Sequence, residues 1–368
     1  SSINAVINEN SNPAATEFSI QIGSDYVQAN GTLGATQVWQ NKAAWGGSSG
    51  VAITGLSVNT AYSVTVIARN NPATVTSASS ATIKYTHVNT PTQTISAITS
   101  SQLAITIGEN SNPGSTVYAL KIGSNYVQAN GTVSASAIYQ TAAVWGTKTA
   151  TGVTASTTYT VQVIAKNGDE DITNGTSTAS TTYTLVDTPT QTLSNVATTS
   201  MSVSIGTATN PSTTQYSVKF NSSYVQANGT LAAEQIWQTN TTWTNLFSVT
   251  GLTASTSYTV QIIARNDNND TTNGSSSSTT TSTLLESAIT QTLSAITSTG
   301  IGVTIGAGGN PGTTEYSIQF GSSYVQANGT LAGGQIWQTA AVWGSPMSVT
   351  GLTPATSYTV SITARNGV

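Results

Sequence analysis

The sequence predicts an all-β protein, built as a tandem array of four β-sandwich domains. The motif Tyr-Val-Gln-Ala-Asn-Gly-Thr occurs four times, and its asparagine recurs about every 100 residues, at Asn30, Asn130, Asn228 and Asn328. That spacing is the length of one small β-sandwich domain. Short segments in each unit alternate apolar with hydroxylated residues, which is the two-residue period of a half-buried strand. No segment shows a convincing helical period.

Four such units account for the whole chain of 368 residues, with expected boundaries at 1–88, 89–186, 187–286 and 287–368. Internal units open with a first strand such as residues 190–196 and close with a seventh strand such as residues 180–186. The first unit opens directly in its second strand at Ile3, and the fourth ends just after its sixth. We therefore expect unit one to lack its first strand and unit four its last. The exposed sheet edges would then be completed by a longer array or by neighbouring molecules.

The fourth unit shows the individual strands most clearly. Residues 301–305 and 316–320 alternate apolar and polar positions on either side of a turn signal at Asn310-Pro311. Residues 357–364 alternate Ser or Thr with apolar side chains, which predicts the sixth strand.

The segment that leads into this sixth strand is itself repeated. Gly-Leu-Thr-Pro-Ala-Thr-Ser-Tyr at 351–358 has counterparts beginning at Gly55, Gly152 and Gly251, and each is followed by alternating apolar residues and Ala-(Arg or Lys)-Asn. This pattern resembles the fibronectin type III family, whose sixth strand is entered through a similar corner. The resemblance implies immunoglobulin-like sandwiches with a tyrosine corner, in which the phenol hydroxyl bonds to nearby backbone. It also implies tandem repeats of a microbial extracellular or surface protein.

Two features depart from that family. The usual tryptophan of the second strand is replaced by isoleucine, at Ile7, Ile107, Ile205 and Ile305. The segment between the third strand and the tyrosine corner is long, so we expect an extra hairpin there.

This long segment contains a regular pair of aromatic residues. The first position holds Trp39, Tyr139, Trp237 and Trp337, and the second holds Trp45, Trp145, Trp243 and Trp343. Large aromatic rings usually fill the cores of small domains, and these would replace the missing second-strand tryptophan. The alternative is that the first-position rings form a glycan-stacking platform.

The recurrent heptapeptide has three interpretations. Asn-Gly between extended segments favours a two-residue type I′ hairpin turn, in which both residues need positive φ. Asn-Gly-Thr is also an N-glycosylation acceptor, which makes Asn30, Asn130, Asn228 and Asn328 candidate glycan sites. A ligand-binding loop is the third interpretation, although nothing in the motif ionises at neutral pH.

Composition excludes several function classes. Only 6% of residues are charged, against about 25% in an ordinary soluble protein, and no basic patch exists to bind nucleic acid. The chain has no cysteine and no apolar run long enough to predict a membrane span. Near-neutral surfaces of this kind tend to associate.

Candidate sites for chemistry are few. His87 is the one histidine, and no carboxylate recurs in all four units, so we expect no catalytic residue, no cofactor and no enzyme. Lys121 and Lys219 match between two units, which is poor support for isopeptide bonds. The loops after the sixth strand offer weak calcium candidates at Asp169, Asp171, Asp267 and Asp270.

These observations predict a structural repeat protein of an extracellular filament, sheath or surface layer, with copies of itself as its partner. The alternative is a multivalent adhesin or glycan-binding accessory array that uses the aromatic segment of each unit.

Overall fold

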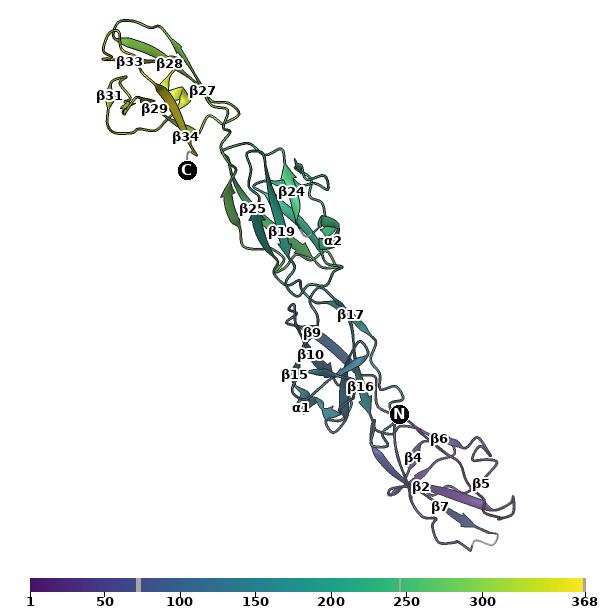
Figure 1. Cartoon of the computed structure of the whole chain (residues 1–368). Helices are drawn as coiled ribbons and strands as arrows, with labels where there is room; N and C mark the ends of the chain where they lie inside the picture. Colours follow the sequence, from purple (N-terminus) through teal and green to yellow (C-terminus); the bar gives the residue numbers. More distant parts are fainter. Residues whose placement is uncertain (71–73, 245, 367–368) are drawn as a thin grey trace. The chain divides into compact units, whose positions relative to one another are not determined.

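The computed structural model describes residues 1–70, 74–244 and 246–366 (Figure 1). It divides into two compact units, Ser1–Thr184 and Leu185–Val368, and each unit contains two of the sequence repeats. Every repeat has its own cluster of buried hydrophobic residues. None of the helices in the described part of the chain is long and apolar enough to span a membrane.

The second repeat shows the architecture completely. Its first sheet has the order β15-β10-β9, and its second has the order β13-β12-β11-β16-β17, with β14 pairing the start of β11. All pairs are antiparallel. The elements are β9 (Thr92–Ser96), β10 (Gln102–Gly108), β11 (Val117–Ile122), β12 (Asn125–Val127), β13 (Val133–Ser134), β14 (Gln140–Thr141), α1 (Ala142–Trp145), β15 (Thr147–Thr151), β16 (Thr158–Lys166) and β17 (Ser180–Tyr183).

The third repeat has the same topology, and the fourth follows it as far as its sixth strand. The third contains β18 (Thr190–Ser194), β19 (Ser200–Gly206), β20 (Gln215–Phe220), β21 (Ser223–Val225), β22 (Leu231–Ala232), β23 (Gln238–Thr239), α2 (Asn240–Trp243), β24 (Phe247–Thr250), β25 (Ser257–Arg265) and β26 (Thr279–Ser282). The fourth contains β27 (Thr290–Ser294), β28 (Gly300–Gly306), β29 (Glu315–Phe320), β30 (Ser323–Val325), β31 (Leu331–Ala332), β32 (Gln338–Thr339), α3 (Ala340–Trp343), β33 (Met347–Thr350) and β34 (Val360–Arg365).

The first repeat differs in its first sheet, where β1 pairs β6 alone among the described residues. Its second sheet matches those of the second and third repeats. Its elements are β1 (Ile3–Ala5), β2 (Glu17–Ile22), β3 (Asp25–Val27), β4 (Leu33–Gly34), β5 (Gln40–Asn41), β6 (Val51–Ile53), β7 (Ala61–Arg69) and β8 (Thr82–Tyr85).

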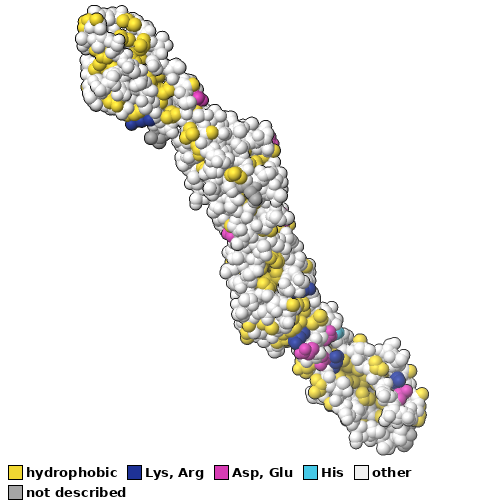
Figure 2. All heavy atoms as spheres, in the orientation of Figure 1, with side chains coloured by type: hydrophobic (Ala, Val, Ile, Leu, Met, Phe, Trp, Pro, Cys, Tyr) yellow, Lys and Arg dark blue, Asp and Glu magenta, His cyan; other side chains and the backbone are white. Residues whose placement is uncertain are grey.

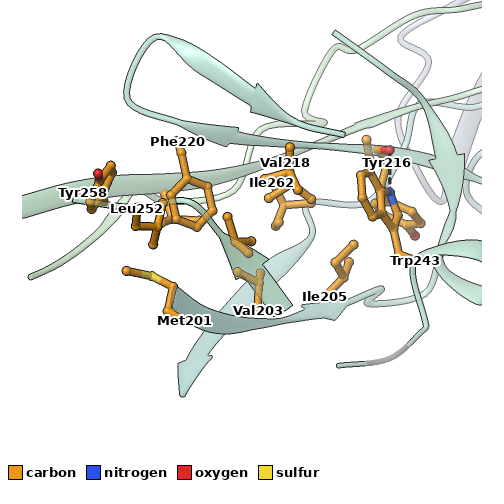
Figure 3. Packing of buried hydrophobic residues seen from close by; sticks show 14 of the residues in the cluster. Met201, Val203, Ile205, Tyr216, Val218, Phe220, Trp243, Leu252, Tyr258 and Ile262 are labelled. Carbon is orange, nitrogen blue, oxygen red and sulfur yellow. Dashed lines mark hydrogen bonds between the residues drawn. The ribbon is translucent and has the colours of Figure 1, made fainter. Parts of the chain in front are cut away.

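The core lies between the two sheets, as the alternating sequence pattern predicts. In the third repeat, Figure 3 shows Met201, Val203 and Ile205 on one strand facing Val218 and Phe220 on another. Burial of aliphatic and aromatic side chains from both sheets is the main source of stability for a sandwich. The extra hairpin expected before the tyrosine corner is present as β12 and β13 and their counterparts.

Short helical turns were not expected from the sequence, yet three repeats contain one. Thr141, Thr239 and Thr339 cap these four-residue helices by accepting a hydrogen bond from the backbone nitrogen three residues later. Each turn ends on the second tryptophan of the aromatic pair and directs it into the core, so the turn is explained by tertiary packing.

Candidate functional site

The buried member of each aromatic pair is a core residue. Trp45, Trp145, Trp243 and Trp343 are between 1% and 4% exposed. Each indole nitrogen donates a hydrogen bond to the carbonyl oxygen of the second residue of the third strand: Phe18, Tyr118, Tyr216 or Tyr316, at 2.7–2.9 Å. Figure 3 shows this arrangement for Trp243 and Tyr216. The prediction that large rings fill the core is therefore confirmed for the second position.

The first member of each pair is half-buried. Trp39, Trp237 and Trp337 have an arginine guanidinium 4.5–4.6 Å from the ring centroid, and Tyr139 has the Lys166 ammonium at 4.3 Å. Such a cation over an aromatic face is attracted by the ring quadrupole. One face of each first-position ring is therefore in contact with a cation from its own repeat. Burial also raises the pKa of the Tyr139 hydroxyl.

A third residue positions each cation. Glu17 accepts a hydrogen bond from Arg69 at 2.6 Å, and Glu315 accepts one from Arg365 at 2.6 Å. In the third repeat, Gln215 accepts bonds from Arg265 at 2.9 and 2.6 Å. The acceptor and the cation are paired residues on the third and sixth strands. Val117 occupies the acceptor position in the second repeat, and there Lys166 instead pairs with Glu170, four residues later.

These cations were not identified from the sequence as site residues, although a signal was present. The chain has 9 lysines and arginines, and Arg69, Lys166, Arg265 and Arg365 all occupy the same repeat position. In a chain with so few charges, that recurrence indicates a shared role.

The recurrent heptapeptide forms the tip of a hairpin, but the turn type predicted from Asn-Gly is wrong. In the first repeat the Gln28 nitrogen donates to the Thr32 carbonyl at 2.8 Å, and the Gly31 nitrogen donates to the Gln28 carbonyl at 2.8 Å. Gly31 has φ of 81°, whereas Asn30 is not among the described residues with positive φ. The loop therefore has three residues, Ala29 to Gly31, with only the last left-handed. Its geometry is that of a type I turn followed by a glycine bulge.

The polar side chains of the motif form hydrogen bonds within the loop. The Asn30 side-chain oxygen accepts bonds from the Thr32 backbone nitrogen at 3.1 Å and from its hydroxyl at 2.7 Å. The Gln28 amide donates to the carbonyls of Tyr26 and Thr36. The same bonds recur at Asn130, Asn228 and Asn328 and their neighbours. All four asparagines are exposed, so glycosylation stays a prediction.

The calcium candidates of the second repeat contact the first repeat, within the unit Ser1–Thr184. Asp169 pairs with Lys84 at 2.9 Å and accepts a bond from the Tyr85 nitrogen, and Asp171 lies 2.9 Å from the His87 imidazole. The bond from Lys84 is the largest cause that lowers the pKa of Asp169, and the Thr173 backbone bond is the largest for Asp171. Figure 2 shows the single histidine beside acidic and basic side chains on a face where charge is otherwise sparse.

The asparagine of the Ala-(Arg or Lys)-Asn motif organises this loop. The Asn167 side-chain oxygen accepts bonds from the Asp169 and Asp171 nitrogens, and its amide donates to the Thr86 carbonyl of the first repeat at 3.1 Å. In the unit Leu185–Val368, the corresponding Asn366 accepts a bond from Ser255 of the preceding repeat. The sequence showed this recurrent asparagine but not its part in contacts between repeats.

The remaining candidates are not brought together. Asp270 accepts a bond from the Thr272 nitrogen within its own loop, which also contains Asp267 in sequence. Within residues 1–70, 74–244 and 246–366, no three His, Cys, Asp or Glu side chains are arranged so that they could hold a metal ion. The calcium prediction for Asp169, Asp171, Asp267 and Asp270 stays a prediction. Lys121 and Lys219 lie on β11 and β20, partly exposed.

The tyrosine corner is confirmed in all four repeats. The hydroxyls of Tyr62, Tyr159, Tyr258 and Tyr358 each accept a hydrogen bond at 2.8–2.9 Å from the backbone nitrogen five residues earlier. Together with the two antiparallel sheets, this contact makes the repeats tandem sandwiches of the fibronectin type III kind.

Comparisons with known proteins concern the fold alone. No protein-family model matches the chain, and no curated protein matches it. Among solved structures, the chain is similar to a two-domain fibronectin type III segment of chicken tenascin, with 17% identity and a TM-score of 0.35, covering 52% of this chain and 98% of that segment. It is also similar to the FN1–FN3 domains of chicken CNTN1, with 16% identity and a TM-score of 0.22, covering 73% and 88%.

Proposed function

We propose that this chain is a structural repeat protein of a microbial extracellular filament, sheath or surface layer. Its copies assemble through contacts between their β-sandwich domains. The repeat boundaries predicted from the sequence are part of this proposal, since each repeat would act as one building block.

The observation that carries the proposal is the composition of the sheet edges. In the second and third repeats the edge strands are β9, β13, β15, β17, β18, β22, β24 and β26. Among them only Lys148 of β15 is charged, and none contains proline. Monomeric β-proteins usually block edge pairing with charges, especially lysine, or with proline. Edges without these features favour strand-to-strand association between molecules.

A matched pair of lysine substitutions tests this proposal. Thr192 lies on the edge strand β18 and Thr259 on the interior strand β25, and both side chains are exposed. Thr192→Lys should weaken concentration-dependent association measured by light scattering, whereas Thr259→Lys, which adds the same charge, should not. Equal behaviour of the two variants and the unmodified chain would contradict association through edges.

The half-buried first-position rings favour one alternative, a multivalent adhesin or glycan-binding array. Trp39, Tyr139, Trp237 and Trp337 recur with equivalent partners, so a weak sugar contact at each would add up along the chain. Titration with oligosaccharides while tryptophan fluorescence is followed tests this alternative. The substitution Trp237→Ala should remove part of any response.

A further inference from the structure

The junction between the first and second repeats, within the unit Ser1–Thr184, contains an Asn-Gly pair that is held by the neighbouring repeat. The Gly168 nitrogen donates a hydrogen bond to the Asn59 side-chain oxygen at 3.2 Å. The Asn167 side-chain amide donates to the Thr86 carbonyl at 3.1 Å, and Asn167 is only 4% exposed. Both bonds therefore exist only while the two repeats are in contact.

Asn-Gly is the dipeptide in which asparagine most readily loses ammonia. The glycine nitrogen attacks the side-chain carbonyl carbon of the asparagine, so that a new C–N bond forms and the side-chain amide leaves as ammonia. Water then opens the cyclic imide at either carbonyl and gives aspartate or isoaspartate. Glycine favours the reaction because it has no side chain to restrict its backbone. A hydrogen bond from the glycine nitrogen slows the reaction, because this nitrogen must lose its proton before it attacks.

The other Asn-Gly pairs are protected within their own loops. In each of them the glycine nitrogen donates to the carbonyl oxygen three residues earlier, at 2.7–2.9 Å. These pairs begin at Asn30, Asn130, Asn174, Asn228, Asn273 and Asn328. Among the pairs that the structure describes in full, Asn167-Gly168 is the one whose glycine nitrogen bonds a residue of another repeat.

The packing of the junction explains why a glycine follows Asn167. A Cβ atom on Gly168 would overlap the aromatic ring of Tyr85 in the first repeat. A larger residue would therefore separate the loop from the first repeat. The close contact of the two repeats thus requires the glycine that also makes Asn167 reactive.

We propose that Asn167 is a site of spontaneous deamidation that the closed junction suppresses, and that its modification holds the junction open. The inference goes beyond the proposed function, because it concerns one joint within the chain and requires no association between molecules. While the repeats are in contact, Asn59 holds the proton of the Gly168 nitrogen and Asn167 is shielded from water. Once the junction opens, this nitrogen attacks as it does in a flexible chain.

The product of the reaction disfavours closure. Aspartate at position 167 has no amide to donate to the Thr86 carbonyl, and its carboxylate would face that carbonyl oxygen. The same loop already carries the carboxylates of Asp169 and Asp171. Two facing acceptors and added like charge both destabilise the closed arrangement. An opening that leads to modification is therefore made permanent.

Peptide mass spectrometry of the chain during incubation in mildly alkaline buffer tests the first part of the proposal. Asn59→Gly removes the acceptor of the Gly168 nitrogen and tolerates the φ of 45° at that position. It should speed deamidation at Asn167 about fivefold, which is the effect of one ordinary hydrogen bond on the equilibrium between the closed and open junction. Asn174, in the same loop, should keep its rate because its protecting bond is local.

Two lysine substitutions provide a matched comparison. Lys84 pairs with Asp169 across the junction at 2.9 Å, whereas Lys148 donates to the Ala129 carbonyl within the second repeat. Lys84→Ala should speed deamidation at Asn167 roughly twofold, as expected for loss of a partly exposed ion pair. Lys148→Ala removes the same charge and should leave the rate unchanged.

A variant that carries the product tests the second part. Asn167→Asp should lower the protection of the Tyr85 amide against hydrogen exchange about tenfold, because the contact that brings Asp169 to the Tyr85 nitrogen is weakened. Asn174→Asp is the control. It adds the same charge to the same loop, away from the bond to Thr86, and should leave the protection of Tyr85 unchanged.

Each part of the proposal has a result that would overturn it. If Asn59→Gly and Lys84→Ala leave the rate at Asn167 unchanged, the junction does not control deamidation. If the rate at Asn174 rises by the same factor, the whole loop has loosened and control through the Asn59 bond is wrong. If Asn167→Asp keeps the protection of Tyr85, modification does not hold the junction open.

Discussion

Gly229 packs against the carbonyl oxygen of Ser248 so closely that a Cβ atom on the glycine would overlap it. Gly229 has φ of 82°, and its own carbonyl accepts a hydrogen bond from Thr250 at 2.9 Å. The same approach to a neighbouring strand occurs at Gly31, Gly131 and Gly329. The hairpin tip is therefore attached to the opposite sheet in every repeat, which gives a structural reason for the recurrence of the heptapeptide.

Substitution of this glycine tests that attachment. Gly229→Ala should lower the free energy of unfolding of the third repeat by about 2–4 kcal/mol, because strain at positive φ adds to the overlap with Ser248. Gly251→Ala is the control, since Gly251 has φ of 73° but no atom within 4 Å of an added Cβ. It should cost only about 1 kcal/mol. Denaturant unfolding of both variants would measure the difference, and equal losses would show that the close approach contributes nothing.

The two tryptophans of a pair should respond differently to removal of the indole nitrogen. Trp243→Phe leaves the buried Tyr216 carbonyl without its donor and opens a small cavity, so we expect a loss of about 2–4 kcal/mol. Trp237→Phe keeps a ring beneath Arg265 and should cost about 1 kcal/mol or less. Thermal unfolding of the two variants compares them directly. A greater loss of stability in Trp237→Phe than in Trp243→Phe would show that the core role has been assigned to the wrong ring.

The tyrosine corner offers a test of the shared architecture. Tyr258→Phe removes the acceptor of the Thr253 nitrogen while the ring still contacts Phe220, and should cost about 1–2 kcal/mol. Tyr224→Phe, on the hairpin strand β21, is a control for loss of a phenol hydroxyl elsewhere in the same repeat. If Tyr258→Phe and Tyr224→Phe lower the denaturant midpoint by the same amount, the tyrosine-corner hydrogen bond makes no special contribution to stability.

Acid should loosen the contact between the first and second repeats. The pKa values of Asp169 and Asp171 are lowered from 3.8, so the stability they contribute is complete above that value. It is lost as the pH falls through the lower folded-state values, where the carboxylates take up protons. The protection of the Tyr85 amide against hydrogen exchange, relative to an unfolded chain at the same pH, should fall as the pH drops below 3.8, because its nitrogen donates to Asp169. Asp169→Asn should remove most of this pH dependence, whereas Asp267→Asn should leave it unchanged.

The sequence predicted the parts of the fold that depend on local patterns. The tyrosine corner follows from one segment, and its hydroxyl bonds a nitrogen only five residues away. The turn type was wrong because the Asn-Gly rule considers two residues, whereas the loop closes through the backbone of Gln28 and so includes Ala29.

Contacts between distant residues were beyond the sequence patterns. Asn59 of the first repeat forms hydrogen bonds with Gly168 and Thr116 of the second. The positions of these residues in the sequence do not indicate that they are in contact. Ionic partners for Asp169 were missed for the same reason, because Lys84 lies in another repeat. The cation over each first-position ring could have been predicted from the sequence, because a basic residue recurs at the same position of all four repeats.

Electron microscopy of the purified chain across a range of concentrations tests the central claim most directly. A structural repeat protein that associates through its sheet edges should form filaments or layers with a regular spacing as concentration rises, and Thr192→Lys should reduce them while Thr259→Lys does not. Isolated single chains at every concentration, with the β-sheet content intact by circular dichroism, would contradict the account.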